Sequence, residues 1–182
     1  MAKLATNTYG DALFDLAVEE AKIDALYEEA NAVLTAFEEN NELGKLLNHP
    51  KIDKEEKQKF IEDVFGKFVS KDMTGLLILM VSKDRQQFIT DTLAYFTDRV
   101  LEFKRIGKAV VTTAKPLSES QKAKVVARLL ATTNYVSFNM EYAIDESLIG
   151  GMVIRIGDRV VDSSIKTKLE GLAKDLTKIQ LA

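Results

Sequence analysis

The chain has 182 residues, of which 46% are hydrophobic and 29% are charged, and a formal net charge of −3. These values are typical of one or two globular domains with hydrophobic cores. The longest apolar run, residues 76–81, is far shorter than the roughly 20 residues of a transmembrane helix, so we expect no membrane crossing. The absence of cysteine excludes disulfides and thiolate metal sites. The first residues resemble neither a signal peptide nor a transit peptide, which predicts a location on the cytoplasmic side of the membrane.

Charge is distributed unevenly between two parts of the chain. Residues 1–105 contain 14 lysines and arginines and 20 acidic residues, whereas residues 106–182 contain 11 and 8. The two parts therefore have net charges of −6 and +3, which indicates two domains with different partners. Neither part has the basic stripe that nucleic-acid-binding proteins present, so we expect no DNA or RNA partner.

The first part, residues 1–105, has helical periodicity throughout, because apolar residues recur at spacings of three and four. One segment, GLLILMV, is apolar on all sides, which is typical of the central helix of a bundle. Asp53 and Glu56 form a variant of a capping box where another helix begins. We predict an all-α bundle of five full helices and one short helix. The segments with these patterns are 9–17, 24–37, 43–47, 53–65, 75–81 and 88–103.

The second part, residues 106–182, combines helix and strand patterns. Residues 109–113 are rich in β-branched side chains, and Ser118 with Gln121 marks the start of a helix that ends near Ala131. From Val136 to Ile144 apolar and polar residues alternate, which is the pattern of a half-buried strand. We predict a small α/β domain with a mixed sheet and two helices, so that the whole chain has an α+β fold.

The segment DESLIGGMVIRIGDRVVDSS, residues 145–164, contains three of the nine glycines of the chain. Gly157 and Asp158 separate two strand patterns, which predicts a hairpin turn of type II′. Gly150 and Gly151 are expected to have positive φ angles where the chain passes from one strand to the next. A helix follows, and we expect its apolar residues to face the sheet. These residues are Ile165, Leu169, Leu172, Ala173, Leu176 and Ile179.

Patterns for catalysis or nucleotide binding are weak. No Gly-Lys pair has the preceding glycine of a P-loop, and the sequence lacks GxGxxG, while Asp145, Asp158 and Asp162 would repel an anion at the glycine-rich segment. The single histidine, His49, has no second histidine or cysteine with which to bind a metal. Adjacent glutamates lie on polar helix faces, and the Ser163-Ser164 pair is placed to cap a helix. We therefore expect no catalytic residue, no cofactor and no metal.

Several motifs together are specific by their order and spacing. The C-terminal motif contains Asp145, Gly150-Gly151, Gly157-Asp158, Asp162 and Ser164. Further motifs are Tyr9-x-x-Ala12-Leu13-Phe14-x-Leu16-Ala17, Leu47-x-x-Pro50-x-Ile52 with Lys57, and Arg85. Over its full length the chain resembles the delta subunit of bacterial F-type ATP synthase, a family whose mitochondrial relative is the oligomycin-sensitivity-conferring protein. Gly10 departs from the alanine that is usual in the family and costs about 0.5 to 1 kcal/mol inside a helix.

The resemblance implies a non-catalytic stator subunit at the top of the peripheral stalk, in support of proton-driven rotary ATP synthesis. In the family, a groove between the first and fifth helices receives the N-terminal helix of an alpha subunit of the catalytic head. The C-terminal domain contacts the b subunits of the stalk. Residues 1–105 would then bind the head and residues 106–182 the stalk. The subunit would lie at the cytoplasmic face of the cell membrane and associate with it only through the complex.

The resemblance also assigns roles to individual residues. Leu176 and Ile179 are expected to contact the b subunits. The motif of Asp145, Gly150, Gly151, Gly157, Asp158, Asp162 and Ser164 is expected to build and orient the domain and to bind no nucleotide. The alpha-subunit groove is expected to be lined or supported by Tyr9, Ala12, Leu13, Leu16, Leu76, Leu79, Met80 and Lys83. For Leu13, Leu16 and Leu76, burial in the bundle core is the favoured alternative to direct contact.

A function from another class stays open at this point, namely a two-domain protein-binding adaptor unrelated to ATP synthase. Genes for other synthase subunits beside the gene for this chain would count against the adaptor. An isolated locus would favour it.

Overall fold

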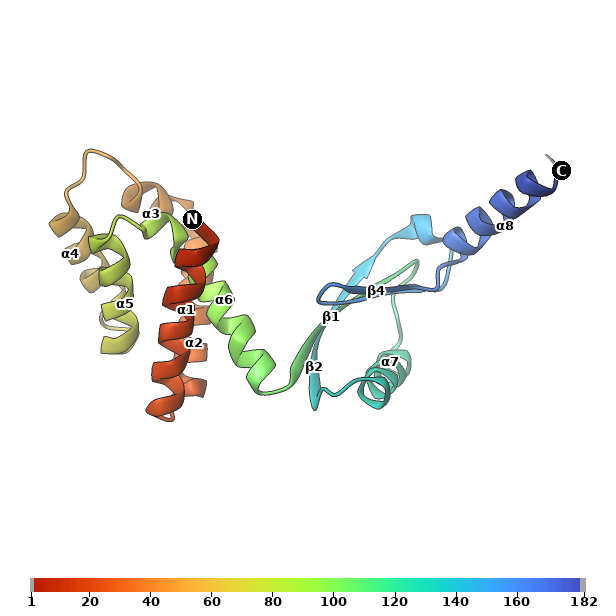
Figure 1. Ribbon diagram of the computed structural model, residues 1–182, viewed down its shortest axis with the longest axis horizontal. Coiled ribbons are helices and arrows are strands. Elements are labelled where there is room, and N and C mark those ends of the chain that lie inside the picture. Colours follow the sequence, from red (N-terminus) through yellow and green to blue (C-terminus); the bar gives the residue numbers. More distant parts are fainter. Residues whose placement is uncertain (1, 181–182) are drawn as a thin grey trace. The chain divides into compact units, whose positions relative to one another are not determined.

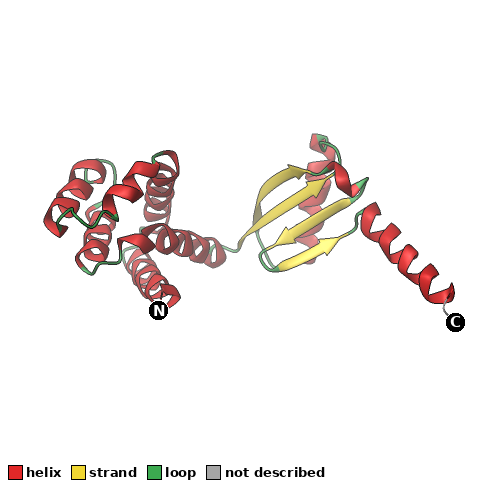
Figure 2. Ribbon diagram, turned by 90° about the horizontal axis from the view of Figure 1, so that it is seen from above, coloured by secondary structure: helices red, strands yellow, loops and turns green. Residues whose placement is uncertain are grey.

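The structure is a computed structural model that describes residues 2–180, with the side chains of residues 5–174 and of Leu176. Its contacts divide the chain into two compact units, Met1–Leu101 and Glu102–Ala182. Figures 1 and 2 show helices in the first unit and a sheet with helices in the second. The division falls a few residues before the boundary predicted after residue 105.

The first unit is an all-α bundle, as predicted. Its described residues form five long α-helices and one short one, with a 3₁₀ turn before the last helix. Asp53 occupies the N-cap position of α4 as predicted, but its side chain accepts no hydrogen bond there, so no capping box forms. The elements are α1 (Ala2–Glu19), α2 (Ile23–Glu39), α3 (Asn41–Leu47), α4 (Lys54–Phe65), α5 (Lys71–Ser82), η1 (Gln86–Phe88) and α6 (Ile89–Phe103).

One hydrophobic core joins these helices. Each helix contributes apolar residues at helical spacing, such as Leu26, Ala30 and Val33 from α2, because residues three and four apart lie on one face. Helix α5, predicted to be the central helix, has five buried residues, whereas α6 has seven. Leu79 of α5 is nevertheless 45% exposed. One face of the central helix therefore stays open to the surface.

The second unit is a mixed four-stranded sheet with two helices, which confirms the predicted α+β fold class. The strand order is β2-β1-β3-β4. Strands β1 and β2 are parallel and are joined by a crossover through α7, whereas β1 pairs antiparallel with β3, and β3 with β4. The elements are β1 (Ile106–Thr113), α7 (Glu119–Thr132), β2 (Ser137–Ile144), η2 (Glu146–Leu148), β3 (Met152–Ile156), β4 (Arg159–Asp162) and α8 (Ile165–Gln180).

Helix α7 covers one face of this sheet. Val125 and Leu129 of α7 are buried against Ala109 and Val111 of β1. The helix begins with the predicted capping box, in which Ser118 and Gln121 each accept a backbone N–H of the other. A matched cap and apolar stripe position α7 on the sheet.

The glycine-rich segment makes two of its predicted turns. Gly157 has a φ of +55° and Asp158 has a negative φ, the pattern of a type II′ turn, between the paired residues Ile156 and Arg159. Gly151 has a φ of +77°, as expected. The expectation for Gly150 is wrong, because the other positive φ, +65°, falls on the preceding residue Ile149.

Gly151 is required for a second, steric reason. A Cβ atom at this position would overlap the backbone carbonyl oxygen of Ser163. Because both the positive φ and the close approach exclude a side chain, we expect Gly151→Ala to lower the free energy of unfolding of the C-terminal unit by about 1–3 kcal/mol. Urea unfolding followed by NMR signals of this unit measures the change.

Gly171→Ala is the matched control for this prediction. Gly171 lies in α8, and an added Cβ would meet nothing within 4 Å. The substitution should therefore change only the helix propensity and raise the free energy of unfolding by about 0.5–1 kcal/mol. A Gly151→Ala variant as stable as the parent chain would contradict the assignment of Gly151 as a strained position.

Candidate functional site

Helices α1 and α5 run in opposite directions, and residues at or just beyond their ends contact each other. At one end, Lys22, just after α1, pairs with Asp72 in the first turn of α5, with 3.3 Å between Nζ and Oδ2. At the other end, the Arg85 guanidinium, just after α5, donates to the Tyr9 hydroxyl over 3.3 Å and lies 5.4 Å from its ring centroid. These two polar contacts link the ends of two helices that also share the hydrophobic core.

Helix α1 is also held on its side toward α6. Asp11 accepts a hydrogen bond from the Tyr95 hydroxyl at 3.0 Å and pairs with Arg99, with 3.3 Å between Nε and Oδ1. The Arg99 guanidinium lies 5.4 Å from the ring centroid of Phe14. Because α1 has partners on two helices, its remaining exposed face presents a preformed surface.

The residues predicted for the groove fall into three groups. Leu13, Leu76 and Met80 are buried in the bundle core and can only support a partner site from beneath. Tyr9 and Leu16 are half-buried, while Ala12, Leu79 and Lys83 are exposed. We call Tyr9, Ala12, Leu16, Leu79 and Lys83 the α1–α5 surface.

Arg85 belongs beside this surface but was not among the predicted groove residues. Its contacts with Tyr9 close one end of the α1–α5 pair. The sequence held a signal for it, since Arg85 follows the apolar central helix and belongs to the recognised motifs. Periodicity could not reveal it, because a residue beyond the end of a helix has no place in the helical pattern.

The C-terminal motif builds the start of α8. Ser164 is fully buried, and its hydroxyl accepts the Thr167 N–H at 3.2 Å, which makes it an N-cap. Asp162 accepts the Ser164 N–H at 2.8 Å and the Thr167 hydroxyl at 2.7 Å. The Ile165 N–H donates to the carbonyl of Gly150 at 2.9 Å. The glycine pair and the Asp-Ser pair thus meet at one junction.

This arrangement disfavours an anion or nucleotide at the junction. An anion at a helix start binds through backbone N–H groups that have no other partner. At the start of α8, the N–H groups of Ser164, Ile165 and Thr167 already donate to protein oxygens. Asp162 also places a carboxylate where an anion would lie. The motif therefore acts as a structural joint between the sheet and α8.

Two carboxyl groups of the motif have perturbed acidities. Hydrogen bonds from the Ser164 N–H and the Thr167 hydroxyl lower the pKa of Asp162 below its ordinary value. Hydrogen bonds from the hydroxyl and the backbone N–H of Ser147 lower the pKa of Asp145 in the same way. Both groups stabilise the fold in their ionised form.

The start of α8 should therefore weaken in acid. Because the pKa of Asp162 is lowered in the folded chain, its contribution is present above a carboxyl pKa of about 4 and is lost as the pH falls through the lower folded value. We expect the amide NMR shifts of Ser164 and Thr167 to change with a midpoint below about pH 4. Asp162→Asn should abolish this pH-dependent change in the amide shifts, whereas the control Asp158→Asn should retain it. A midpoint at or above the ordinary value would contradict the cap.

Helix α8 differs from the prediction in one important respect. Its apolar residues were expected to face the sheet, but Ile165, Leu169, Leu172 and Leu176 are 42%, 51%, 60% and 65% exposed. In Figures 1 and 2, α8 extends away from the sheet. The expectation was wrong because periodicity shows which face of a helix is apolar and not what covers it. We call these four residues the α8 stripe.

The α8 stripe includes one of the two residues predicted to contact the stalk. Leu176 is its most exposed member, whereas the side chain of Ile179 lies outside the described residues. Ile165, Leu169 and Leu172, exposed on the same stripe, were not among the predicted contact residues, although their spacing was a signal. Steps of four, three and four residues repeat the heptad of helices that pack on other helices.

Comparisons with known proteins agree with this architecture. The family described as "ATP synthase delta (OSCP) subunit" matches residues 5–176. The chain is 53% identical over 181 residues to ATP synthase subunit delta of Lachnoclostridium phytofermentans, with all of both chains covered. It is 31% identical over 174 residues to the same subunit of Brevibacillus brevis, with 96% and 99% covered.

A solved structure has the same fold. A chain of the Toxoplasma gondii mitochondrial ATP synthase hexamer aligns with a TM-score of 0.75 at 20% identity, over 94% of this chain and 97% of that one. The chain belongs to the ATP synthase delta (OSCP) subunit family, whose members are structural subunits of the ATP synthase stator. Among the described residues, no helix has the length and apolar character to span a bilayer.

Proposed function

We propose that this chain is a non-catalytic stator subunit that links the catalytic head of an F-type ATP synthase to its peripheral stalk. The observation that carries the proposal is the pair of separate apolar surfaces, the α1–α5 surface on one unit and the α8 stripe on the other. Family membership supplies the assembly in which they act. The subunit would lie at the cytoplasmic face of the cell membrane and be bound there through the complex alone.

The α1–α5 surface is proposed to bind the N-terminal helix of an alpha subunit. A partner helix can approach α1 closely at Ala12, because alanine has a small side chain and is exposed. Leu79, 45% exposed on α5, offers an apolar contact on the other side. Lys83 and Arg85 add positive charge at one end, which favours an acidic residue on the partner helix. The buried Leu13, Leu76 and Met80 keep the two helices packed beneath the contact.

Substitution of Ala12 tests the head-binding surface. Ala12→Asp would place a charge in an apolar contact and should weaken binding of a synthetic alpha-subunit N-terminal helix at least tenfold, about 1.4 kcal/mol or more. Titration calorimetry with the full chain measures the dissociation constant. The matched control is Ala94→Asp, at an exposed alanine of α6, which costs the same helix propensity and should leave binding unchanged. Normal binding by a folded Ala12→Asp chain would place the site elsewhere.

The α8 stripe is proposed to bind the b subunits of the stalk. Four large apolar side chains in a heptad spacing fit the knobs-into-holes packing of another helix. Lys166 and Lys168 lie next to the stripe at the start of α8, so an acidic segment on the partner helix would match it. Burial of the stripe would also stabilise the second unit, since a ligand that binds only the folded form raises its stability.

Hydrogen exchange of the full chain tests the stalk-binding surface. In the free chain we expect amides of the second unit, and of α8 above all, to exchange faster than those of the bundle core, because few side chains cover them. Addition of the membrane-free part of the b subunit should slow exchange in α8 markedly. Equal protection of both units without any partner would contradict this account.

Two variants separate a contact from a general effect on folding. Leu172→Gln removes one apolar side chain of the stripe and should weaken b binding roughly tenfold. Lys174→Gln changes an exposed residue of the same helix that lies off the stripe and should retain the parent affinity. Equal affinities of the two variants would argue that b binds another face.

A further inference from the structure

A cleft on the second unit lies between α7 and the β3–β4 hairpin. Two adjoining hollows of about 420 and 310 Å³ form it and share Thr132, Thr133, Ile156 and Arg159. Its floor is apolar and consists of Leu129, Ile154, Ile156 and Val161. Val161 is 52% exposed, so the floor lies open where β4 forms the edge of the sheet. We call this region the α7–β4 cleft.

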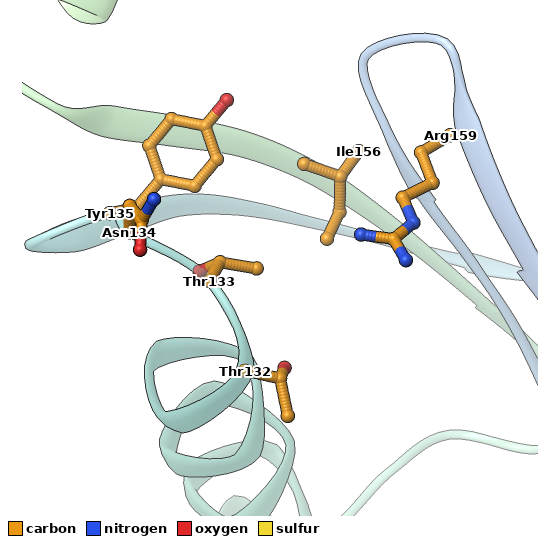
Figure 3. A pocket seen from close by; sticks show the side chains of 6 residues that line it. All are labelled: Thr132, Thr133, Asn134, Tyr135, Ile156 and Arg159. Atoms are coloured by element: carbon orange, nitrogen blue, oxygen red, sulfur yellow. The ribbon is translucent and has the colours of Figure 1, made fainter.

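Two arginines flank the cleft. Figure 3 shows the Arg159 side chain, from the start of β4, pointing across the hollow toward Thr132 and Thr133 at the end of α7. Arg128 of α7 lines the adjoining hollow. No carboxylate lines either hollow, and in the described part of the chain neither guanidinium is paired with an acidic residue. The cleft therefore combines an apolar floor with uncompensated positive charge.

Strand β4 offers the cleft an open backbone edge. It is the last strand of the sheet and pairs only with β3 on its inner side. Ile156 and Arg159 flank the two-residue turn, and the Ser163 N–H donates to the Met152 carbonyl. In an antiparallel pair only alternate residues of a strand bond to the neighbouring strand, so Arg159, Val161 and Ser163 bond to β3. The backbone N–H and C=O of Val160 therefore face outward. Val160 is 56% exposed. An added strand could bond to this edge.

We propose that the α7–β4 cleft binds an extended acidic and apolar segment of a partner protein, which adds to the sheet beside β4. Successive side chains of a strand point to opposite faces, so residues two apart on the segment would enter the cleft together. One would be a glutamate or aspartate opposite Arg159, and the other an apolar residue opposite Val161. The short edge supplies few backbone hydrogen bonds, and the side chains therefore determine affinity and selectivity. This inference does not depend on the proposed stator role.

A designed peptide tests the proposal with the full chain. The probe is a heptapeptide with blocked ends and the central sequence Val-Thr-Glu-Thr-Val, in which a valine lies two residues from the glutamate on each side, so that the peptide can match the cleft in either strand direction. We expect its addition to shift the NMR signals of Val160, Val161 and Thr133, with saturation. Arg159→Ala should weaken the affinity roughly tenfold, because a charge-assisted hydrogen bond is lost. Lys124→Ala, an equal loss of charge elsewhere on α7, should not.

Two altered peptides distinguish the outcomes. Glutamine in place of glutamate should weaken binding as much as Arg159→Ala does, and should have no further effect in that variant. N-methylation of both the first threonine and the second valine should abolish binding, because these two changes together remove the backbone hydrogen bond to the Val160 carbonyl in either strand direction. Absence of saturable shifts at these residues would overturn the proposal. Binding that tolerates N-methylation would also overturn it, since the segment would then not be an added strand.

Discussion

The second unit has more apolar surface than its own elements can cover. Among the described residues, four buried residues form its core cluster, compared with seventeen in the bundle. Small domains bury a smaller fraction of their surface than large ones. The excess lies on α8 and along β4, where apolar side chains are about half exposed. Such surfaces are typical of proteins that complete their packing against partners.

The bundle, in contrast, covers its own core and presents a preformed surface. Its core is continuous, and polar contacts at both ends of α5 and between α1 and α6 fix the helices that form its proposed binding surface. A preformed surface loses little entropy when a partner helix binds. In the proposed assembly, two units in one chain would also raise the effective concentration of each partner for the other, which would favour slow dissociation.

Local signals in the sequence predicted much of the fold. The Ser118–Gln121 capping box, the Gly157 turn and the six helices of the bundle are each encoded by residues close together in sequence. The failures concern contacts between distant residues. Gly10 read as a weak point of α1, yet a Cβ there would overlap the ring of Tyr95 in α6. The sequence identified the apolar face of α8 but did not show that this face is exposed. For the candidate groove, the favoured burial of Leu13 and Leu76 is found, but the sequence did not separate the buried Met80 from the exposed Leu79.

A simultaneous-binding experiment shows whether each unit holds a different partner. The full chain would first be saturated with the membrane-free part of the b subunit and then titrated with the alpha-subunit N-terminal helix. We expect a ternary complex, in which the helix binds with the same dissociation constant as it does to the free chain. Displacement of b by the helix, or failure of the helix to bind the b-saturated chain, would contradict it.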